Sequence, residues 1–252
     1  MTLVETRDLC KNYGGFRALD RVSLAFGDGE LVSIVGPNGA GKTTLVNLLI
    51  GLLLPSSGTV HFKGRDIAGL TPVVLAELGM ARAFQLVQIF PRLTVAETIA
   101  TAVISRQGKQ WQFLSSASSD RDLAARVHEV AEVFRLQDRL QTRSALLSQG
   151  EKKLLDVASA FALKPEVILL DEPTSGVSSA EKHAVMITLI AAAKAAGVKA
   201  IILVEHDMDL VAAYSRRIVA LCEGKVLADL PPEAFFADTV MVDTVVGRRR
   251  GR

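Results

Sequence analysis

"GPNGAGKTT", residues 36–44, is the most informative run of this sequence for its fold. It matches the pattern G-x-x-x-x-G-K-[ST] through Gly36, Gly41, Lys42 and Thr43. The apolar run "LVSIV" precedes it, and "KTTLVNLLIGLL", whose leucines recur at helical spacing, begins inside it. A glycine-rich turn between a strand and a helix N-terminus lets backbone N–H groups surround phosphates. The stretch therefore predicts a P-loop in an α/β fold, with a nucleotide phosphate as its ligand.

The loop is expected to supply phosphate contacts and part of a metal site. Lys42 is expected to neutralise charge on the β- and γ-phosphates, and the Thr43 hydroxyl is expected to bind Mg²⁺. Every residue of the loop is a candidate for nucleotide binding: Gly36, Pro37, Asn38, Gly39, Ala40, Gly41, Lys42, Thr43 and Thr44.

"VILLDE", residues 167–172, predicts the second half of the site. Its four apolar residues form a buried strand that brings Asp171 to the strand's C-terminal end, where ligands bind in open α/β sheets. Asp171 is expected in the Mg²⁺ shell. Glu172 lies one residue further and is placed to accept a proton from an attacking water. Acids directly after so apolar a run favour a function over a solvated turn.

Composition limits the partners and the compartment. The 252 residues suit one large α/β domain or a core with a smaller subdomain. The net charge of +2 gives no support to nucleic acid as a partner. Cys10 and Cys222 are too few for a disulfide framework, which favours a reducing compartment. The N-terminus shows no signal core, and no segment has the roughly 18 apolar residues of a spanning helix.

Strand-like runs occupy both ends of the chain, and helical patterns occupy the middle. Strands are predicted at "SLAF" (23–26), "LVSIVG" (31–36) and "KAIILVEHD" (199–207), with hairpins at "GTVHFKGRDI" (58–67) and "RIVALCEGKVLADL" (217–230). Helices are predicted at "TVAETIATAVI", "RDLAARVHEVAEVF" and "EKKLLDVASAFAL", and a loop at "SRQGKQWQFLSSASSD" (105–120). We therefore predict an α/β nucleotide-binding core from residues 1–93 and 163–252, with a helical subdomain at 94–162.

"LLSQGEKK", residues 146–153, reads by itself as a helix start with Ser148 as the N-cap. Its neighbours in the sequence give it a second meaning. Gln85 in "ARAFQ", the loop at Ser148, Asp171 and His206 in "LVEHD" follow one another in the order of the Q-loop, signature, Walker B and H-loop. Over roughly residues 3–230 the chain thus resembles the ATPase of an ABC transporter.

The resemblance implies one ABC ATPase domain over residues 1–252. Its fold is α/β, with a P-loop NTPase core of mixed sheet, an N-terminal antiparallel β subdomain and an inserted α-helical subdomain. The signature loop belongs to that helical subdomain.

The resemblance also assigns roles, with ATP and Mg²⁺ as cofactors. Tyr13 in "KNYGG" is implied to stack on adenine, and His206 to contact the γ-phosphate. Gln85 is implied to link Mg²⁺ and the attacking water to a membrane partner. The signature residues implied to bind ATP are Ser148, Gln149, Gly150 and Glu151. The implied catalytic residues are Glu172, His206, Gln85 and Lys42, and the implied metal ligands are Thr43, Gln85 and Asp171.

The partners implied by the resemblance are protein subunits. A second ATPase subunit, identical or different, completes a head-to-tail dimer in which each ATP lies between one P-loop and the other signature. The dimer is implied to act with integral membrane permease subunits, and indirectly with a periplasmic substrate-binding protein. This places the chain at the cytoplasmic face of a bacterial inner membrane. The basic end "GRRRGR" (247–252) is expected to be a solvated tail, with anionic lipid or a membrane-protein partner as the alternative.

Finer features resemble the ATPases of branched-chain (hydrophobic) amino-acid importers. They are "YGGFRALDRVSL", "GMARAFQLVQIFPRLTVAETI" and "VEHDMDLV". Import of branched-chain or other hydrophobic amino acids is therefore predicted. Urea, short amides or aromatic acids remain alternatives, because the permease and the binding protein choose the substrate.

Departures from the family pattern leave other functions open. Gln149 and Glu151 replace glycine and glutamine in the signature, Ser178 lies in an altered D-loop, and Ser159 stands where arginine is common. These changes suit a weakly catalytic regulatory partner in a heterodimer. A soluble ABC protein of translation or DNA repair would carry two cassettes or a coiled-coil insertion. A small-molecule kinase would not need His206 or the serine loop.

Overall fold

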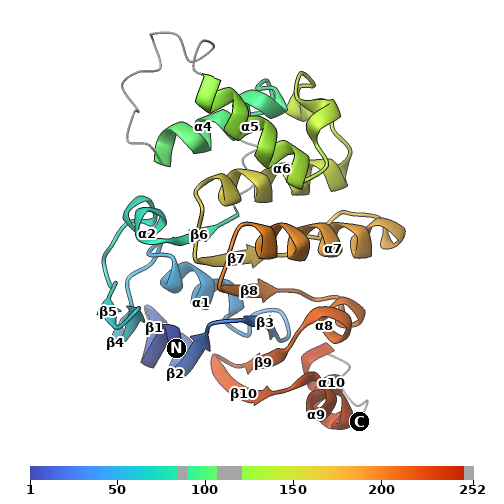
Figure 1. The fold of residues 1–252 in the computed structure, drawn as a ribbon. Coiled ribbons are helices and arrows are strands. Elements are labelled where there is room, and N and C mark those ends of the chain that lie inside the picture. Colours follow the sequence, from blue (N-terminus) through green and yellow to red (C-terminus); the bar gives the residue numbers. More distant parts are fainter. Residues whose placement is uncertain (84–89, 107–120, 247–252) are drawn as a thin grey trace. The chain divides into compact units, whose positions relative to one another are not determined.

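The computed structural model describes residues 1–83, 90–106 and 121–246 (Figure 1). Its strands form two sheets, and helices make up the rest of the regular structure. Most of the loop predicted at 105–120 and all of the basic end 247–252 lie outside these ranges.

The smaller sheet is antiparallel and has the strand order β2-β1-β4-β5. Its strands are β1 (Thr2–Tyr13), β2 (Phe16–Gly27), β4 (Ser57–Phe62) and β5 (Arg65–Asp66). The predicted antiparallel N-terminal region and the hairpin at 58–67 are confirmed. The sequence pattern does not reveal β1, because register shifts on both sides of Leu9 break the alternation of buried and exposed residues.

The larger sheet is mixed and has the order β10-β9-β3-β8-β7-β6. Its strands are β3 (Glu30–Val35), β6 (Met80–Arg82), β7 (Val167–Asp171), β8 (Ala200–Val204), β9 (Arg217–Cys222) and β10 (Lys225–Leu230). β3 runs parallel to β8 and β9, and β9 and β10 form the predicted antiparallel hairpin. Buried parallel strands read as unbroken apolar runs, which is why the sequence indicates them so clearly.

The helices are α1 (Lys42–Leu49), α2 (Pro72–Leu78), α4 (Val95–Arg106), α5 (Arg121–Val133), α6 (Gln149–Ala162), α7 (Ser179–Ala195), α8 (Met208–Tyr214), α9 (Pro232–Ala237) and α10 (Thr239–Val246). The predictions of α4, α5 and α6 are confirmed. The helical pattern after the P-loop continues past Leu49, yet α1 ends there. Gly51 adopts φ +72°, and a Cβ on it would lie 2.1 Å from the Leu70 carbonyl oxygen, so the chain turns at a position that only glycine fits.

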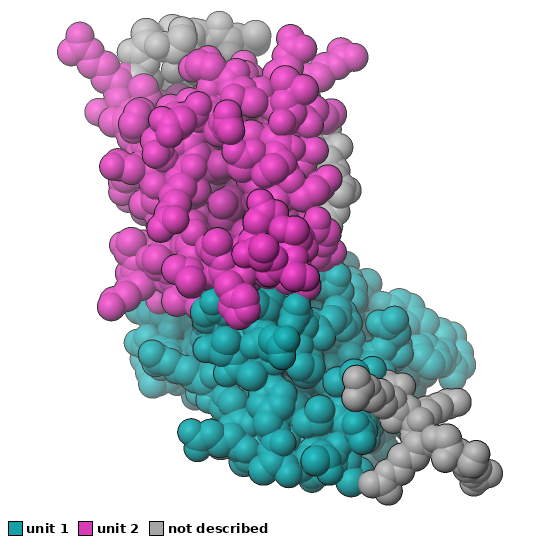
Figure 2. Space-filling view, turned by 90° about the vertical axis from the view of Figure 1, so that its right-hand side faces the viewer, with its two compact units in different colours: residues 1–80, 169–172, 199–252 teal, residues 81–168, 173–198 magenta. Residues whose placement is uncertain are grey.

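The chain forms two compact units (Figure 2). The first comprises residues 1–80, 169–172 and 199–252, and the second comprises residues 81–168 and 173–198. In the second unit α4, α5 and α6 pack together, and Phe134 meets Phe161 edge to face with ring centroids 5.2 Å apart. The subdomain limits at residues 94 and 162 stay a prediction. Among the described residues, no helix combines the length and apolarity needed to cross a membrane.

Candidate functional site

The P-loop connects β3 to α1 in the first unit. Two of its glycines are required by the fold itself. A Cβ on Gly36, which has φ +151°, would lie 2.2 Å from the Leu221 carbonyl oxygen, and a Cβ on Gly41, at φ +102°, would lie 2.6 Å from that of Ala18. The loop is therefore wrapped closely against neighbouring backbone, with Gly41 as the N-cap of α1. This is the conformation in which backbone N–H groups and a helix N-terminus face an anion.

Lys42 is folded over this loop. Its ammonium donates to the carbonyl oxygens of Gly36, at 2.7 Å, and Pro37, at 3.0 Å, and the residue is 6% exposed. Burial lowers the pKa of Lys42, and the charges of Glu172 and Asp171 partly oppose that shift. The cation thus lies among loop carbonyls with two carboxylates in range, and a bound phosphate would offer it a stronger acceptor.

Asp171 is the last residue of β7, and Glu172 follows it in an unusual backbone conformation. Glu172 has φ +48°, which is rare for a residue other than glycine. Its N–H donates to the Val204 carbonyl oxygen at 2.9 Å, which ties it to the end of β8. Such backbone strain is concentrated at functional sites.

His206 reaches the Glu172 carboxylate from the loop that follows β8. Its Nε2 is hydrogen-bonded to Oε1 of Glu172 at 2.8 Å, and both side chains are 43% exposed. The structure therefore brings together two residues that the sequence separates by more than thirty positions. Both remain open to solvent, so a ligand or a water molecule can reach them.

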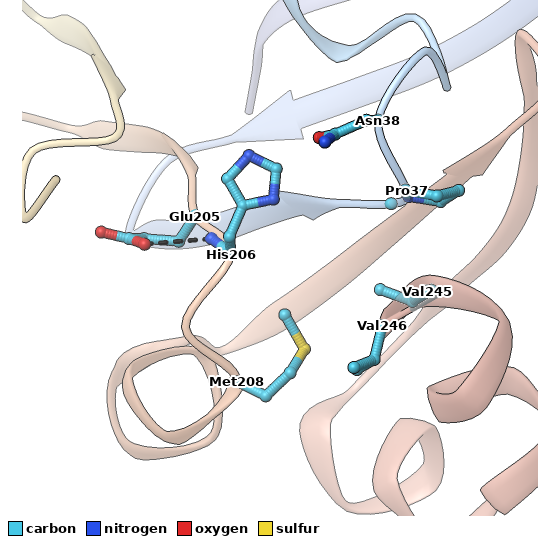
Figure 3. Close-up of a pocket in the computed structure, with 8 residues that line it drawn as sticks. Pro37, Asn38, Glu205, His206, Met208, Val245 and Val246 are labelled. Atoms are coloured by element: carbon cyan, nitrogen blue, oxygen red, sulfur yellow. Dashed lines mark hydrogen bonds between the residues drawn. The ribbon is translucent and has the colours of Figure 1, made fainter. Parts of the chain in front are cut away.

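Glu205 also belongs to the site, although no sequence motif indicates it. It is 4% exposed, and its Oε2 accepts from the backbone N–H of His206 at 3.0 Å (Figure 3). The same oxygen accepts from the backbone N–H of Asp207 at 3.4 Å. Asp207 is in turn the N-cap of α8. The signal in the sequence was an acid directly after the apolar run "IILV", since a buried carboxylate needs donors close by. Its contacts fix the backbone from which the His206 ring projects.

A cavity of about 300 Å³ opens beside the P-loop. Its lining residues are Gly36, Pro37, Asn38, Glu205, His206, Met208, Val245 and Val246. In Figure 3 the His206 ring extends toward Asn38, and two valines approach from α10. Val245 is buried in an apolar cluster with Phe235, against which Met208 packs. Helix α10, for which the sequence predicts no role, thus forms one wall beside the P-loop and His206.

The signature segment lies at the start of α6 in the second unit, and Ser148 is its N-cap as predicted. Ser148 Oγ accepts from the Glu151 N–H at 3.2 Å, and Glu151 Oε2 accepts from the Ser148 N–H at 2.8 Å, which makes a capping box. Arg139 donates to the other oxygen of the same carboxylate, with Nε 2.9 Å from Oε1. The Glu151 carboxylate is therefore folded back onto the N-cap of α6 and paired with Arg139.

Gly150 differs from the P-loop glycines in its backbone conformation and in the space around its Cα atom. It has no positive φ, and an added Cβ would meet only Val177 and Val185 methyl carbons, each at 3.9 Å, an ordinary contact distance. The chain's own fold does not require glycine here. A requirement for glycine at this position would come from something that approaches the start of α6 from outside.

The remaining predicted residues are distributed over both units. Tyr13 ends β1 with its side chain 47% exposed, and the Lys11 ammonium lies 5.4 Å from its ring centroid. Thr43 is exposed in the first turn of α1. Ser178 donates to Glu181 Oε2 at 2.6 Å, and Ser159 is buried and donates to the Leu155 carbonyl. Gln85 lies outside the described residues.

The residues present suit a metal ion that arrives with a nucleotide. Among the described residues, no group of three His, Cys, Asp or Glu side chains could hold a metal. Mg²⁺ bound to nucleotide phosphates needs only one or two protein oxygens, since water and phosphate supply the rest. The Thr43 hydroxyl and the Asp171 carboxylate are such oxygens.

Comparisons with known proteins agree with this geometry. The family model described as ABC transporter matches residues 19–175. A probable branched-chain amino acid transport ATP-binding protein, LivG of Archaeoglobus fulgidus, is 30% identical over 98% of this chain and 96% of its own length. The high-affinity branched-chain amino acid transport ATP-binding protein LivG of Salmonella typhimurium is 34% identical, with 92% of each chain covered. A solved ATP-binding cassette of an ABC transporter, in its ADP conformation, has a TM-score of 0.86 at 27% identity, covering 98% of this chain and 99% of that one.

Proposed function

This chain belongs to the ABC transporter family, and from that membership we propose that it powers a bacterial importer of branched-chain or other hydrophobic amino acids. As an ABC ATPase it binds and hydrolyses ATP. Its proposed partners are a second ATPase subunit, integral membrane permease subunits and, indirectly, a periplasmic substrate-binding protein. Its proposed location is the cytoplasmic face of the inner membrane.

The observation that carries the catalytic proposal is the grouping of Lys42, Asp171 and Glu172. The Lys42 ammonium is buried on the P-loop within electrostatic range of both carboxylates. A phosphate entering the loop would accept hydrogen bonds from Lys42 in place of the Gly36 and Pro37 carbonyls. Phosphoryl transfer depends mainly on positioning and charge neutralisation, which is what these residues supply.

The proposed roles follow from where each group lies. Thr43 and Asp171 would hold Mg²⁺, which would neutralise phosphate charge when bound. Glu172 would accept the proton of the attacking water, and His206, hydrogen-bonded to Glu172, would hold that carboxylate until the γ-phosphate arrives. Tyr13 would stack on adenine, and Gln85 would report the state of the site to the permease. Ser148 and Gly150 would donate to the γ-phosphate held by the other subunit.

The names of the relatives support the substrate proposal. Both LivG proteins are named for branched-chain amino acid transport. Import of urea, short amides or aromatic acids is the second candidate, since this chain would serve any permease that accepts it. Uptake of leucine and of urea in cells that depend on this chain, with and without Lys42→Ala, separates the two. Leucine uptake is expected to fall and urea uptake to stay unchanged; the reverse result rejects the substrate and leaves the ATPase assignment intact.

Glu172→Gln tests the catalytic proposal. Turnover is expected to fall at least about 100-fold, because general-base catalysis contributes roughly 10² to 10⁴. ATP binding should persist, and nucleotide should favour a dimer. Glu233→Gln removes an exposed acid of α9 and serves as the matched control with unchanged turnover. Persistent turnover in Glu172→Gln rejects the role of Glu172. Absence of any hydrolysis by the unaltered chain with its permease and partner subunit favours the regulatory alternative.

A further inference from the structure

The N-terminus of α6 presents an electrostatic problem. The proposed function requires it to face a γ-phosphate, and a helix N-terminus attracts such an anion. Glu151 lies in the first turn of this helix, next to Gly150. An ionised carboxylate there would repel the phosphate unless its charge were balanced and its position fixed.

The carboxylate is ionised rather than neutral. Burial raises the pKa of Glu151, but the hydrogen bonds from Ser148 and Arg139, together with the Arg139 charge, outweigh burial and lower it below its usual value. Protonation therefore does not remove the negative charge at neutral pH. A nearby cation has to balance it.

Arg139 supplies that cation from a well-anchored segment. It ends the short 3-10 helix η3 (Gln137–Arg139), whose backbone is tied to the fully buried Leu136 by a bond from the Arg139 N–H at 2.9 Å. The Thr142 N–H donates to the Arg139 carbonyl at 2.7 Å. The guanidinium occupies Oε1 of Glu151 while the Ser148 N–H occupies Oε2, so both carboxylate oxygens are already hydrogen-bonded within the chain.

This arrangement leaves three donors at the helix start for an outside anion. Ser148 Oγ accepts from the Glu151 N–H, so its own hydroxyl hydrogen can be donated elsewhere. The N–H groups of Gln149 and Gly150 belong to the first turn, where a helix offers no partner four residues earlier. The capping box fixes the N-cap residue Ser148 beside these donors, and Arg139 holds the Glu151 carboxylate that completes the box.

We propose that Arg139 is a positioning residue of the signature loop: it neutralises Glu151 and holds its carboxylate against Ser148, so that the start of α6 attracts the γ-phosphate of the ATP held by the other subunit. The proposal rests on the proposed function, because it needs the signature to contact ATP across a dimer. Within that function it explains how a signature with glutamate in place of glutamine would still attract a phosphate.

Four variants test the pair: Arg139→Gln, Glu151→Gln, the double variant and Arg139→Lys. Arg139→Gln is expected to raise the ATP concentration needed for dimerisation at least fivefold in a Glu172→Gln background, and to raise KM for ATP similarly in the active chain. Glu151→Gln alone should change either value by less than about twofold, since glutamine keeps the acceptor of the capping box. In the double variant both values should return to within about twofold of the parent. Arg139→Lys keeps the positive charge, so it should dimerise at nearly the same ATP concentration as the parent.

Two controls separate positioning from folding. Arg143→Gln removes an exposed cation from the same segment without breaking the Glu151 pair and should leave dimerisation unchanged. Affinity of the isolated subunit for a fluorescent ATP analogue should be equal in all variants, because that ATP contacts the P-loop. The Arg139→Gln defect should also shrink at about 0.5 M salt, where charge interactions are screened.

The results distinguish failure of the positioning role of Arg139 from failure of the proposed function. If the double variant is as impaired as Arg139→Gln, charge compensation is wrong and Arg139 acts only through folding. If Arg139→Gln behaves like the parent, Arg139 has no positioning role. If the Glu172→Gln parent itself never dimerises with ATP, the proposed function fails instead.

Discussion

Replacing Gly150 with alanine is expected to make the protein more stable and inactive. Glycine within a helix is less favourable than alanine by about 0.5 to 1 kcal/mol. The added methyl would meet Val177 and Val185 at 3.9 Å, so it causes no clash within the chain. For a chain of this size, 1 kcal/mol corresponds to about 2 to 4 °C in Tm, so we expect a rise of about 1 to 4 °C.

Activity should move in the opposite direction. The Gly150 N–H is one of the donors proposed to face the γ-phosphate, and a methyl group beside it would hold the phosphate away. Loss of one donor to developing negative charge costs roughly 2.7 to 4 kcal/mol, or about 10² to 10³ in rate. We therefore expect ATP hydrolysis to fall at least about 100-fold while binding of ATP to the isolated subunit is unchanged.

Gly51→Ala is the matched comparison. Its Cβ would lie 2.1 Å from the Leu70 carbonyl oxygen at φ +72°, so this variant should lose stability in the same thermal melt. The reasoning fails if Gly150→Ala keeps more than a third of the parent activity, because the position would then face no ligand. It also fails if Gly150→Ala melts as early as Gly51→Ala, because the glycine would then serve the fold.

Three further predictions concern single groups. Lys42→Ala should weaken ATP binding at least about tenfold by calorimetry, since a hydrogen bond to a charged group contributes roughly 1.5 to 3 kcal/mol; an unchanged affinity would contradict the role of Lys42. Val245→Asp should lower the free energy of unfolding by about 3 kcal/mol in urea, because it buries an unpaired charge in the cluster around Phe235, whereas Val245→Ala should cost only about 1.5. Glu151 has a lowered pKa, so its contribution to stability is present above its unfolded value of 4.5 and is lost as pH falls through the folded value. The stability difference between the parent and Glu151→Gln should therefore shrink between about pH 6 and pH 3, and a difference that does not change with pH would contradict the shift.

The sequence predicted the elements whose patterns are local. A few consecutive residues are enough to indicate the P-loop and each buried strand. The same is true of the three helices of the middle segment. β1 was not predicted because its bulges break the alternation of buried and exposed residues. α9 was not predicted because a helix of six residues shows too little periodicity. α7 was not predicted because apolar residues occur on more than one of its faces, so the sequence shows no single apolar face at helical spacing.

The residues of the candidate site also fall into those that a local motif indicates and those that it does not. Lys42, Asp171, Glu172 and His206 could be named from motifs, but the hydrogen bond between Glu172 and His206 depends on β7 and β8 lying side by side in the sheet. Glu205 was missed because its value to the site is a pair of backbone contacts that no motif encodes. Motifs name the reacting groups, whereas the groups that orient them are set by tertiary contacts.

Three glycines show how the two kinds of constraint can be told apart. At Gly36 and Gly41 a side chain would strike the chain's own backbone, so the fold alone requires glycine there. At Gly150 the fold would accept alanine, so a requirement for glycine must come from a ligand. The same test applies to Glu151: the fold would accept glutamine as the capping residue, and under our proposal Arg139 is needed only because glutamate places a negative charge near the phosphate. Some positions can be substituted without harm to the fold but not without harm to the function. Such positions indicate a surface that contacts something outside the chain.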